Sequence, residues 1–281
     1  MRVLHFDAGR EMRGGQWQVL RLIGGLAAAG VESTLLAREN APLYVEARKH
    51  GWRVQPLGIT RALANLRAHT LIHVHDARSH SLGAFLRGRP LVVSRRVSFP
   101  VGSRWKYGRA ARYLAVSEFV KRVLMQGGVP EEKIAVVYDG VPVLEVSHGS
   151  EVLGLEKDSA LLARMGLKTV VNLEEQLPDA AMLVYVTNSE GLGSGALLAM
   201  SAGLPVIASK VGGLPEVIRH GENGLLVEND EQAIRDSIEW LRADPERARA
   251  MGAAARRTVL ERFTVERMVA ATLEVYRAVL A

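Results

Sequence analysis

The sequence predicts an α/β protein with two parallel β-sheets, one in each half of the chain. Three observations lead to this prediction. Apolar strand-like runs alternate with helical patterns along nearly all of the 281 residues. The strand-like runs look buried, which is typical of parallel strands that helices cover on both faces. A turn-rich stretch at 138–150, YDGVPVLEVSHGS, interrupts the alternation and marks a domain boundary.

The first half begins on a strand and keeps the alternation up to this boundary. Short apolar runs predict strands at 2–6, 32–37, 52–57, 70–75, 89–94, 113–117 and 133–140. Helical spacing of apolar residues predicts helices at 14–30, 41–51 and 118–128. Gly30 is placed as the residue that ends the first of these helices.

The second half repeats the pattern over a shorter length. Strands are predicted at 169–173, 181–186, 204–209 and 223–228. Helices are predicted after a cap at Asn229 or Asp230, from Pro245 to about 262, and as an amphipathic segment over 263–281. The stretch 150–168 has a helical pattern where a βαβ unit would be expected. The sequence therefore predicts a shortened second sheet that lacks its first βαβ portion.

The composition of the chain excludes several kinds of chemical site. The chain has no cysteine, which excludes disulfides, thiolate metal sites and cysteine nucleophiles. Its net charge of +6 either favours anionic partners or reflects ordinary arginine usage. No apolar run reaches the ~18 residues of a membrane-spanning helix. The first nine residues read as a strand and not as a signal peptide, so a cytoplasmic location is expected.

One stretch, NSEGLGSGALLAMSAGLPV at 188–206, combines an acid with a glycine-rich helix start. The acid is Glu190, and Ser194 is placed to cap the helix that follows. Free N–H groups at a helix start bind phosphate or hydroxyl oxygens, and a neighbouring carboxylate accepts hydrogen bonds from hydroxyls. This combination suits a nucleotide sugar. The alternative is a glycine-rich turn that serves packing alone.

The longer segment 190–230, EGLGSGALLAMSAGLPVIASKVGGLPEVIRHGENGLLVEND, resembles the donor-binding signature of family 4 retaining glycosyltransferases, which have the GT-B fold. Segments 14–30, 73–86, 93–100, 106–141 and 263–280 are similar to other parts of that family. The resemblance implies two Rossmann-like domains that face a cleft: an acceptor-side domain at 1–143 and an abridged donor-binding domain at 144–263. The helix at 264–281 would cross back toward the first domain.

The resemblance also implies functional residues. Glu190 corresponds to the acid that contacts the donor sugar, and His75 to a histidine near the reacting centre, so these two are the candidate catalytic residues. The implied donor- and phosphate-binding residues are Gly14, Gly15, Gln16, Lys157, Gly191, Leu192, Gly193 and Ser194.

The chain departs from the family pattern at two positions. The acid that would contact the ribose falls on Leu198, and an arginine expected before Lys157 falls on Val152. Leucine cannot accept a hydrogen bond. The departures favour either another ribose contact or a catalytically degenerate protein.

Histidines alternate with apolar residues in LIHVHDARSH at 71–80, so His73 and His75 share one strand face. Asp76 and Arg78 follow at the carboxyl end of this strand, the edge where open α/β sheets bind ligands. A histidine pair also suggests a metal, but no acid lies at clear ligand spacing, so no metal site is predicted.

Cations and aromatic residues interleave in SRRVSFPVGSRWKYGR at 94–109. The basic residues assigned to this patch are Arg95, Arg96, Arg104 and Lys106. Nucleic acid, a phosphorylated or lipid-linked acceptor, an anionic membrane and a solvated loop would each explain the pattern. The resemblance favours the acceptor side, and nucleic acid is not expected as a partner.

Together these features predict transfer of a sugar from a UDP- or GDP-type donor to a glycan or lipid-linked acceptor, with retention and without a cofactor. Peripheral contact with the inner face of the cytoplasmic membrane is a further expectation. The alternative is a degenerate homologue that binds sugars or nucleotides or acts as a scaffold. The oligomeric state is left open.

Overall fold

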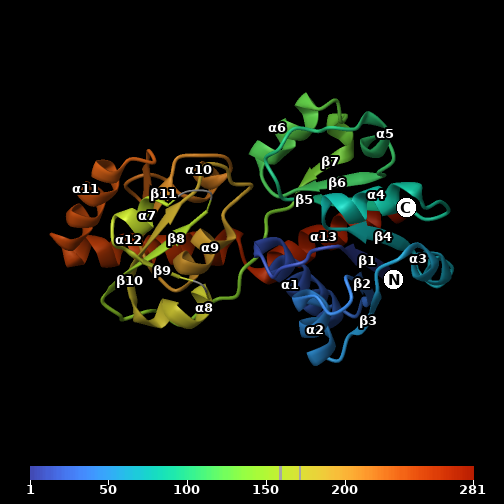
Figure 1. The fold of residues 1–281 in the computed structure, drawn as a ribbon, viewed down its shortest axis with the longest axis horizontal. Coiled ribbons are helices and arrows are strands. Elements are labelled where there is room, and N and C mark those ends of the chain that lie inside the picture. The colour runs from blue at the N-terminus through green and yellow to red at the C-terminus, as the bar shows by residue number, and fades with distance from the viewer. Residues whose placement is uncertain (158–159, 171) are drawn as a thin grey trace. The chain divides into compact units, whose positions relative to one another are not determined.

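The computed structural model describes residues 1–157, 160–170 and 172–281, apart from the side chain of Arg104. It divides into two compact units, each described by itself below (Figure 1). Unit 1 comprises Met1–Tyr138 and Val265–Ala281, and unit 2 comprises Asp139–Thr264. The first break falls at the start of the turn-rich stretch 138–150.

Unit 1 is built on a parallel sheet with strand order β3-β2-β1-β4-β5-β6-β7. The strands are β1 (Arg2–Asp7), β2 (Glu32–Ala37), β3 (Arg53–Pro56), β4 (Leu71–Val74), β5 (Leu91–Arg95), β6 (Arg112–Ala115) and β7 (Ile134–Val136). The strands predicted in this half are confirmed, with ends that differ by a few residues.

The helices of unit 1 come from between these strands and from the end of the chain. They are α1 (Gly14–Ala28), α2 (Pro42–Lys49), α3 (Ile59–Leu66), α4 (Ala77–Phe85), α5 (Arg104–Tyr107), α6 (Glu118–Gln126), the 3₁₀ helix η1 (Glu131–Lys133) and α13 (Val265–Leu280). Side-chain oxygens cap the N-termini of two of these helices. Asp76 accepts from the N–H groups of Arg78 and Ser79 in α4, and Ser117 accepts from that of Val120 in α6.

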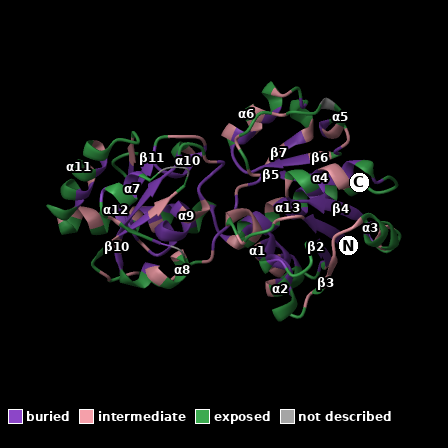
Figure 2. Cartoon of the chain, viewed as in Figure 1, coloured by how far each residue is buried: buried purple, intermediate pink, exposed green. Residues whose placement is uncertain are grey.

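The last helix belongs to the core of unit 1. In α13, Met268, Val269 and Tyr276 pack with residues of β1 and α1 in one buried cluster. The close approach of α1 and α13 depends on Gly25, because a Cβ there would lie 2.5 Å from Val269 Cγ2. Figure 2 shows buried residues along the strands of this sheet. Chain 265–280 is therefore an integral element of the first sheet's helical cover.

The strand order of unit 1 reverses between β1 and β4. The chain runs outward from β1 through β2 to β3, then returns to β4 on the other side of β1. In open parallel sheets, ligands bind at the carboxyl ends of the strands at such a reversal. The carboxyl ends of β1 and β4 lead to Asp7 and His75.

Unit 2 holds a second parallel sheet, with order β12-β11-β10-β8-β9 in the described residues. Its elements are β8 (Glu151–Glu156), α7 (Leu161–Arg164), β9 (Lys168–Thr169), α8 (Leu173–Gln176), the 3₁₀ helix η2 (Leu177–Asp179), β10 (Ala180–Val186), α9 (Ser194–Ser201), β11 (Val206–Ser209), α10 (Leu214–Val217), β12 (Leu225–Val227), α11 (Glu231–Arg242) and α12 (Pro245–Arg262). Leucine, isoleucine and methionine side chains of these strands and helices form its core.

The helical prediction for 150–168 is wrong. Residues 151–156 form β8, which pairs with both β10 and β9 inside the sheet. Gly154 fits between neighbours there, since a Cβ would lie 3.1 Å from Leu162 Cδ1. Glu156 then accepts hydrogen bonds from the N–H groups of Leu161 and Leu162 at the start of α7. Pairing with two neighbouring strands outweighs the helical propensity of this leucine-rich segment.

The strand predicted at 169–173 is also largely wrong. The described strand β9 covers Lys168–Thr169, Val171 lies outside the described residues, and Leu173 already begins α8. The strand order of unit 2 reverses between β8 and β10, because the chain goes from β8 to β9 on one side and then to β10 on the other. This unit therefore has its own reversal, with Lys157 after β8 and residues 187–190 after β10.

Among the described residues, no helix is long and apolar enough to cross a membrane.

Candidate functional site

The reversal of unit 2 brings Lys157 and Glu190 together. Lys157 Nζ lies 2.7 Å from Glu190 Oε2, although 33 residues separate them in sequence. The backbone N–H of Lys157 donates to the carbonyl of Val186 at 2.9 Å, which extends the β8–β10 ladder and fixes where this lysine emerges. An ammonium and a carboxylate thus stand side by side at the edge where parallel sheets bind ligands.

The carboxylate of Glu190 is held from several sides. The Tyr185 hydroxyl donates to Oε2, and the N–H of Gly191 donates to Oε1 at 3.0 Å. The Lys157 ammonium also lies 5.3 Å from the centre of the Tyr185 ring. The Glu190 side chain is 13% exposed, whereas that of Lys157 is 46% exposed. The lysine can therefore turn toward a ligand while the acid keeps its place.

Glycines let the backbone around Glu190 pack closely. Gly212 adopts a φ of +58°, and a Cβ there would lie 1.9 Å from the Glu190 carbonyl oxygen. The N–H of Gly213 donates to that same carbonyl at 3.2 Å. Gly193 has a φ of +107°, a left-handed conformation that favours glycine. Much of the glycine signal in this signature therefore serves backbone packing.

The glycine-rich helix start differs in detail from the prediction. Helix α9 begins at Ser194 with Gly193 at its cap position, so Ser194 is not the cap. Leu192 and Leu198 are buried, and Leu198 offers no polar atom. A Cβ at Gly195 would lie 2.5 Å from Leu155 Cδ2. The first N–H groups of α9 have no partner within the helix, as at every helix start.

A polar network that the sequence did not reveal supports the loop before Glu190. Ser209 Oγ accepts from the N–H of Thr187 and donates to Asn229 Oδ1, while Asn229 Nδ2 donates to the Thr187 carbonyl and to Asn188. These residues come from the ends of β10, β11 and β12. Their separation in sequence hid the network, and only the position of each polar residue at a strand end could have indicated it.

In unit 1, the loop after β1 leads to the predicted glycine turn. Asp7 is buried and accepts hydrogen bonds from the Gly9 N–H at 2.8 Å and from Gln16 Nε2 at 3.2 Å. Burial is the largest cause that raises the pKa of Asp7 to about 6, and the charge of Asp76 adds to it. Gln16 is thus engaged with Asp7. Helix α1 begins at Gly14, and a Cβ at Gly15 would meet open space.

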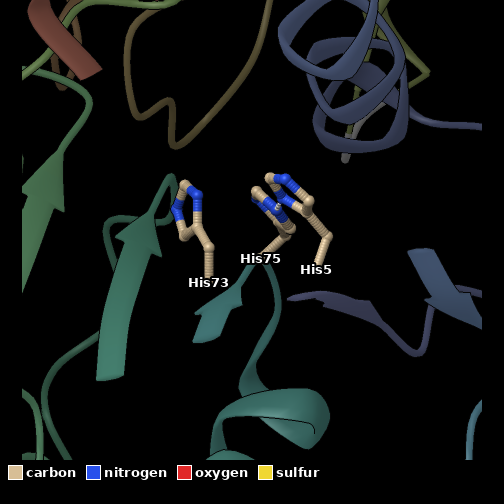
Figure 3. Close-up of side chains that lie close together, drawn as sticks. All are labelled: His5, His73 and His75. Atoms are coloured by element: carbon tan, nitrogen blue, oxygen red, sulfur yellow. Dashed lines mark hydrogen bonds between the residues drawn. The ribbon is translucent and has the colours of Figure 1, made fainter. Parts of the chain in front are cut away.

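Three buried histidines lie beside this loop. Figure 3 shows the rings of His5 and His75 lying together, with His73 to one side. His5 and His73 are register partners on the adjacent strands β1 and β4, and His75 follows β4. His5 Nδ1 lies 3.0 Å from His75 Nε2, and their rings are stacked at 5.2 Å.

Hydroxyl groups are the hydrogen-bond partners of three ring nitrogens in this histidine cluster. His73 Nδ1 lies 2.5 Å from the Tyr276 hydroxyl, and His73 Nε2 lies 2.8 Å from Ser94 Oγ. His5 Nε2 lies 3.3 Å from Ser33 Oγ. Burial lowers the pKa of His5 to about 3 and lowers the pKa values of His73 and His75 well below the ordinary value. The three imidazoles are therefore neutral at physiological pH.

Neutral imidazoles are metal ligands, and one nitrogen from each of the three rings lies within 4.8 Å of the others. The surroundings do not suit a divalent cation. The groups that shift the pKa values of His73 and His75 are burial, other histidines and the cation Arg96, with no carboxylate among them. A metal would also replace a hydrogen bond between His5 and His75.

The predicted basic patch is divided by the structure. Arg95 is buried, and its guanidinium donates to the Tyr107 hydroxyl at 2.7 Å and to the Phe99 carbonyl, so it is not part of an exposed surface. Arg96 is partly buried near His75 and Asp7, where its positive charge adds to the lowering of the pKa of His75 and opposes the rise in the pKa of Asp7. Lys106 Nζ donates to the Ala77 carbonyl at 3.3 Å. The side chain of Arg104 lies outside the described residues.

Each of the two units matches a known family of glycosyltransferases. Residues 12–143 match the family described as Glycosyltransferase Family 4, and residues 153–258 match the one described as Glycosyl transferases group 1. The chain belongs to glycosyltransferase family 4. The resemblance inferred from the sequence is thereby confirmed.

Curated relatives of this family 4 chain match about half of it. An alpha-maltose-1-phosphate synthase of Mycolicibacterium smegmatis is 36% identical over 144 residues, covering 49% of this chain and 37% of the relative. A D-inositol 3-phosphate glycosyltransferase of Streptomyces scabiei is 38% identical over 148 residues, covering 49% and 33%. The match thus spans about a third of the length of these relatives.

Solved structures match the fold over the whole family 4 chain. The Anabaena protein HepE in complex with UDP and glucose has a TM-score of 0.84 at 16% identity, covering 99% of this chain and 100% of that one. A sucrose-phosphate synthase from Thermosynechococcus elongatus has a TM-score of 0.78 at 20% identity, covering 99% and 98%. The predicted GT-B class, with two parallel α/β sheets, is confirmed.

Proposed function

We propose that this chain transfers a sugar from a nucleotide-sugar donor of the UDP or GDP type to a glycan or lipid-linked acceptor, with retention of configuration. Membership of glycosyltransferase family 4 supports this function. The solved relative HepE has been seen with UDP and with UDP-glucose, which supports a nucleotide-sugar ligand.

The observation that carries the proposal is the Lys157–Glu190 pair at the strand reversal of unit 2, joined at 2.7 Å. In this role the ammonium neutralises a donor phosphate as the leaving group departs. Glu190, fixed by Tyr185 and Gly191, accepts hydrogen bonds from sugar hydroxyls. Catalysis then consists of positioning and charge stabilisation, and the donor is a substrate with no added cofactor.

The transfer is tested by incubating the protein with UDP-, GDP- and ADP-sugars and following release of the nucleoside diphosphate. We expect turnover of at least one donor, and loss of turnover in Glu190→Gln. Nuclear magnetic resonance of the anomeric proton in the product distinguishes retention from inversion. Absence of release from every donor, with and without oligosaccharide or polyprenyl-phosphate acceptors, would rule out the transferase.

One observation favours a second candidate, a protein that binds the donor without transferring its sugar. Leu198 is buried in α9 and replaces the acid that the family pattern places there. Such a protein would bind UDP in a calorimetric titration yet release none from UDP-sugars. A gain of turnover in Leu198→Glu would then support the view that this protein has lost its transferase activity.

An exposed aromatic surface supports contact with an anionic membrane. Phe85 and Phe99 are 66% and 65% exposed, and Trp105 packs on Phe85 with ring centres 4.7 Å apart. Arg109 lies over Trp105, with its guanidinium 5.5 Å from the ring centre. Aromatic rings beside cations suit an interface with acidic headgroups. Co-sedimentation with phosphatidylglycerol vesicles, but not phosphatidylcholine vesicles, and its loss in Trp105→Ala would support this contact. Equal binding to both vesicle types would refute it.

A further inference from the structure

The buried pair His5 and His75 contains one polar atom that the rest of the cluster leaves unused. His75 is 6% exposed, and its Nδ1 has no hydrogen-bond partner within the described residues. The other nitrogen of His75 faces His5 Nδ1 at 3.0 Å. An unpaired buried polar atom is costly and calls for a ligand or a water. His75 lies at the strand reversal of unit 1, where ligands bind in parallel sheets.

The bond between the two rings couples their tautomers. Each neutral imidazole carries one proton, and the proton on the His5–His75 bond belongs to either His5 Nδ1 or His75 Nε2. If His5 Nδ1 carries it, both rings are protonated at Nδ1, and His75 offers a donor at its unused atom. If His75 Nε2 carries it, His5 is protonated at Nε2, and His75 offers an acceptor at Nδ1.

The surroundings of His5 are compatible with the second arrangement, and the intrinsic tautomer preference of the imidazole ring favours it. Ser33 Oγ, 3.3 Å from His5 Nε2, can accept the proton there. Both rings then carry the proton on Nε2, which is the intrinsically preferred tautomer of histidine, whereas the first arrangement places both in the less favoured form. His73 does not compete, because its two nitrogens are engaged by Tyr276 and Ser94.

We propose that Ser33 and His5 are positioning residues that hold His75 in the Nε2–H tautomer, so that His75 Nδ1 accepts a hydrogen bond from a hydroxyl group of the ligand. The assignment of this ligand as a sugar-bearing substrate rests on the proposed function, whereas the tautomer does not. A ligand hydroxyl can donate a hydrogen bond to His75 Nδ1. A fully ionised phosphate has no proton to donate, so this nitrogen favours a hydroxyl over a phosphate.

The tautomer is tested on the wild-type protein without any ligand. With ¹⁵N-labelled histidine, long-range ¹H–¹⁵N spectra report which ring nitrogen carries each proton. We expect His5 and His75 both protonated at Nε2, with a ¹⁵N–¹⁵N coupling between His75 Nε2 and His5 Nδ1 across the hydrogen bond. Protonation of either ring at Nδ1 would overturn the proposal. So would one tightly bound metal ion per chain by elemental analysis, because a metal on these rings would exclude the bond.

Two hydroxyl variants on the same strand provide a matched pair. Ser33→Ala removes the acceptor for His5, and we expect the spectra of His75 to show two tautomers. Thr34→Val removes a hydroxyl that bonds His69 at 2.9 Å instead, and the His75 signals should not change. If the His75 signals are the same in Ser33→Ala as in Thr34→Val, the proposed coupling between Ser33, His5 and His75 would be contradicted.

Turnover gives an independent readout. His5→Phe keeps an aromatic ring but removes the bond, and we expect kcat/KM for the donor to fall about tenfold, with the wild-type value kept by Thr34→Val. Ser33→Ala serves the same purpose if His5→Phe does not fold. If the wild type turns over no donor but shows the expected tautomer, the proposed function fails and the coupling stands. Unchanged kcat/KM in both His5→Phe and Ser33→Ala would overturn the positioning role.

Discussion

Glu190→Gln should strengthen the binding of UDP while weakening sugar transfer. In the unliganded protein the carboxylate of Glu190 holds the Lys157 ammonium at 2.7 Å. A phosphate that binds the same ammonium meets this negative charge at about 5 Å, because it approaches from the other side of the nitrogen. Lys157 is nearly half exposed, so the dielectric is close to that of water, and the repulsion amounts to about 1 kcal/mol.

Removal of this repulsion corresponds to about fivefold tighter UDP binding. Glutamine keeps the size of Glu190 and can still accept from Tyr185, so the loop should stay in place. Transfer should nevertheless fall at least tenfold, since hydrogen bonds from sugar hydroxyls to a carboxylate contribute about 1.5–3 kcal/mol.

Isothermal titration with UDP measures the first effect, and the release assay measures the second. Lys157→Met should weaken UDP at least tenfold. Lys168→Met is the matched control, because the Lys168 side chain is about as exposed as that of Lys157 and forms an ion pair with Glu151 at the start of β8, and it should leave UDP affinity unchanged. Weaker UDP binding in Glu190→Gln, or equal losses in the two lysine variants, would refute this reasoning.

Three further predictions concern packing and charge. Gly25→Ala should destabilise unit 1 by about 1–3 kcal/mol because its Cβ meets α13 at 2.5 Å, whereas Gly24→Ala has only an ordinary contact at 3.4 Å and should be neutral or stabilising in thermal unfolding. Gly212→Ala should cost about 3 kcal/mol or more and abolish UDP binding, while Gly221→Ala, left-handed but in open space, should cost about 1–2 kcal/mol and keep it. Asp7→Asn should match the wild type in urea unfolding below pH 3.8. As pH rises through about 6, it should become more stable than the wild type by up to about 3 kcal/mol, because the folded-state pKa of Asp7 is raised from 3.8 and its ionisation then opposes folding. The reverse pH dependence, or equal effects within either glycine pair, would contradict these assignments.

The sequence predicted strands with long apolar runs, such as β10, because burial on both faces leaves a local pattern. It failed at β8, whose residues favour a helix locally and form a strand only through pairing with β9 and β10. That partnership depends on residues up to 30 positions away and leaves no local pattern.

Some residues of the candidate site were predicted from the sequence, and others were missed. Glu190 and Lys157 were found through their likeness to a known family, and the structure shows that they form an ion pair. Tyr185 and His5 were missed, because each reads as an ordinary member of an apolar strand. Their contacts with Glu190 and His75 arise only when strands distant in sequence pair in register.

A crystal structure of the protein soaked with UDP tests the central claim most directly. The account predicts the diphosphate within hydrogen-bond distance of Lys157 Nζ, beside the glycine-rich backbone of residues 191–194 and next to Glu190. A diphosphate bound elsewhere, or an unoccupied site at saturating UDP, would contradict it.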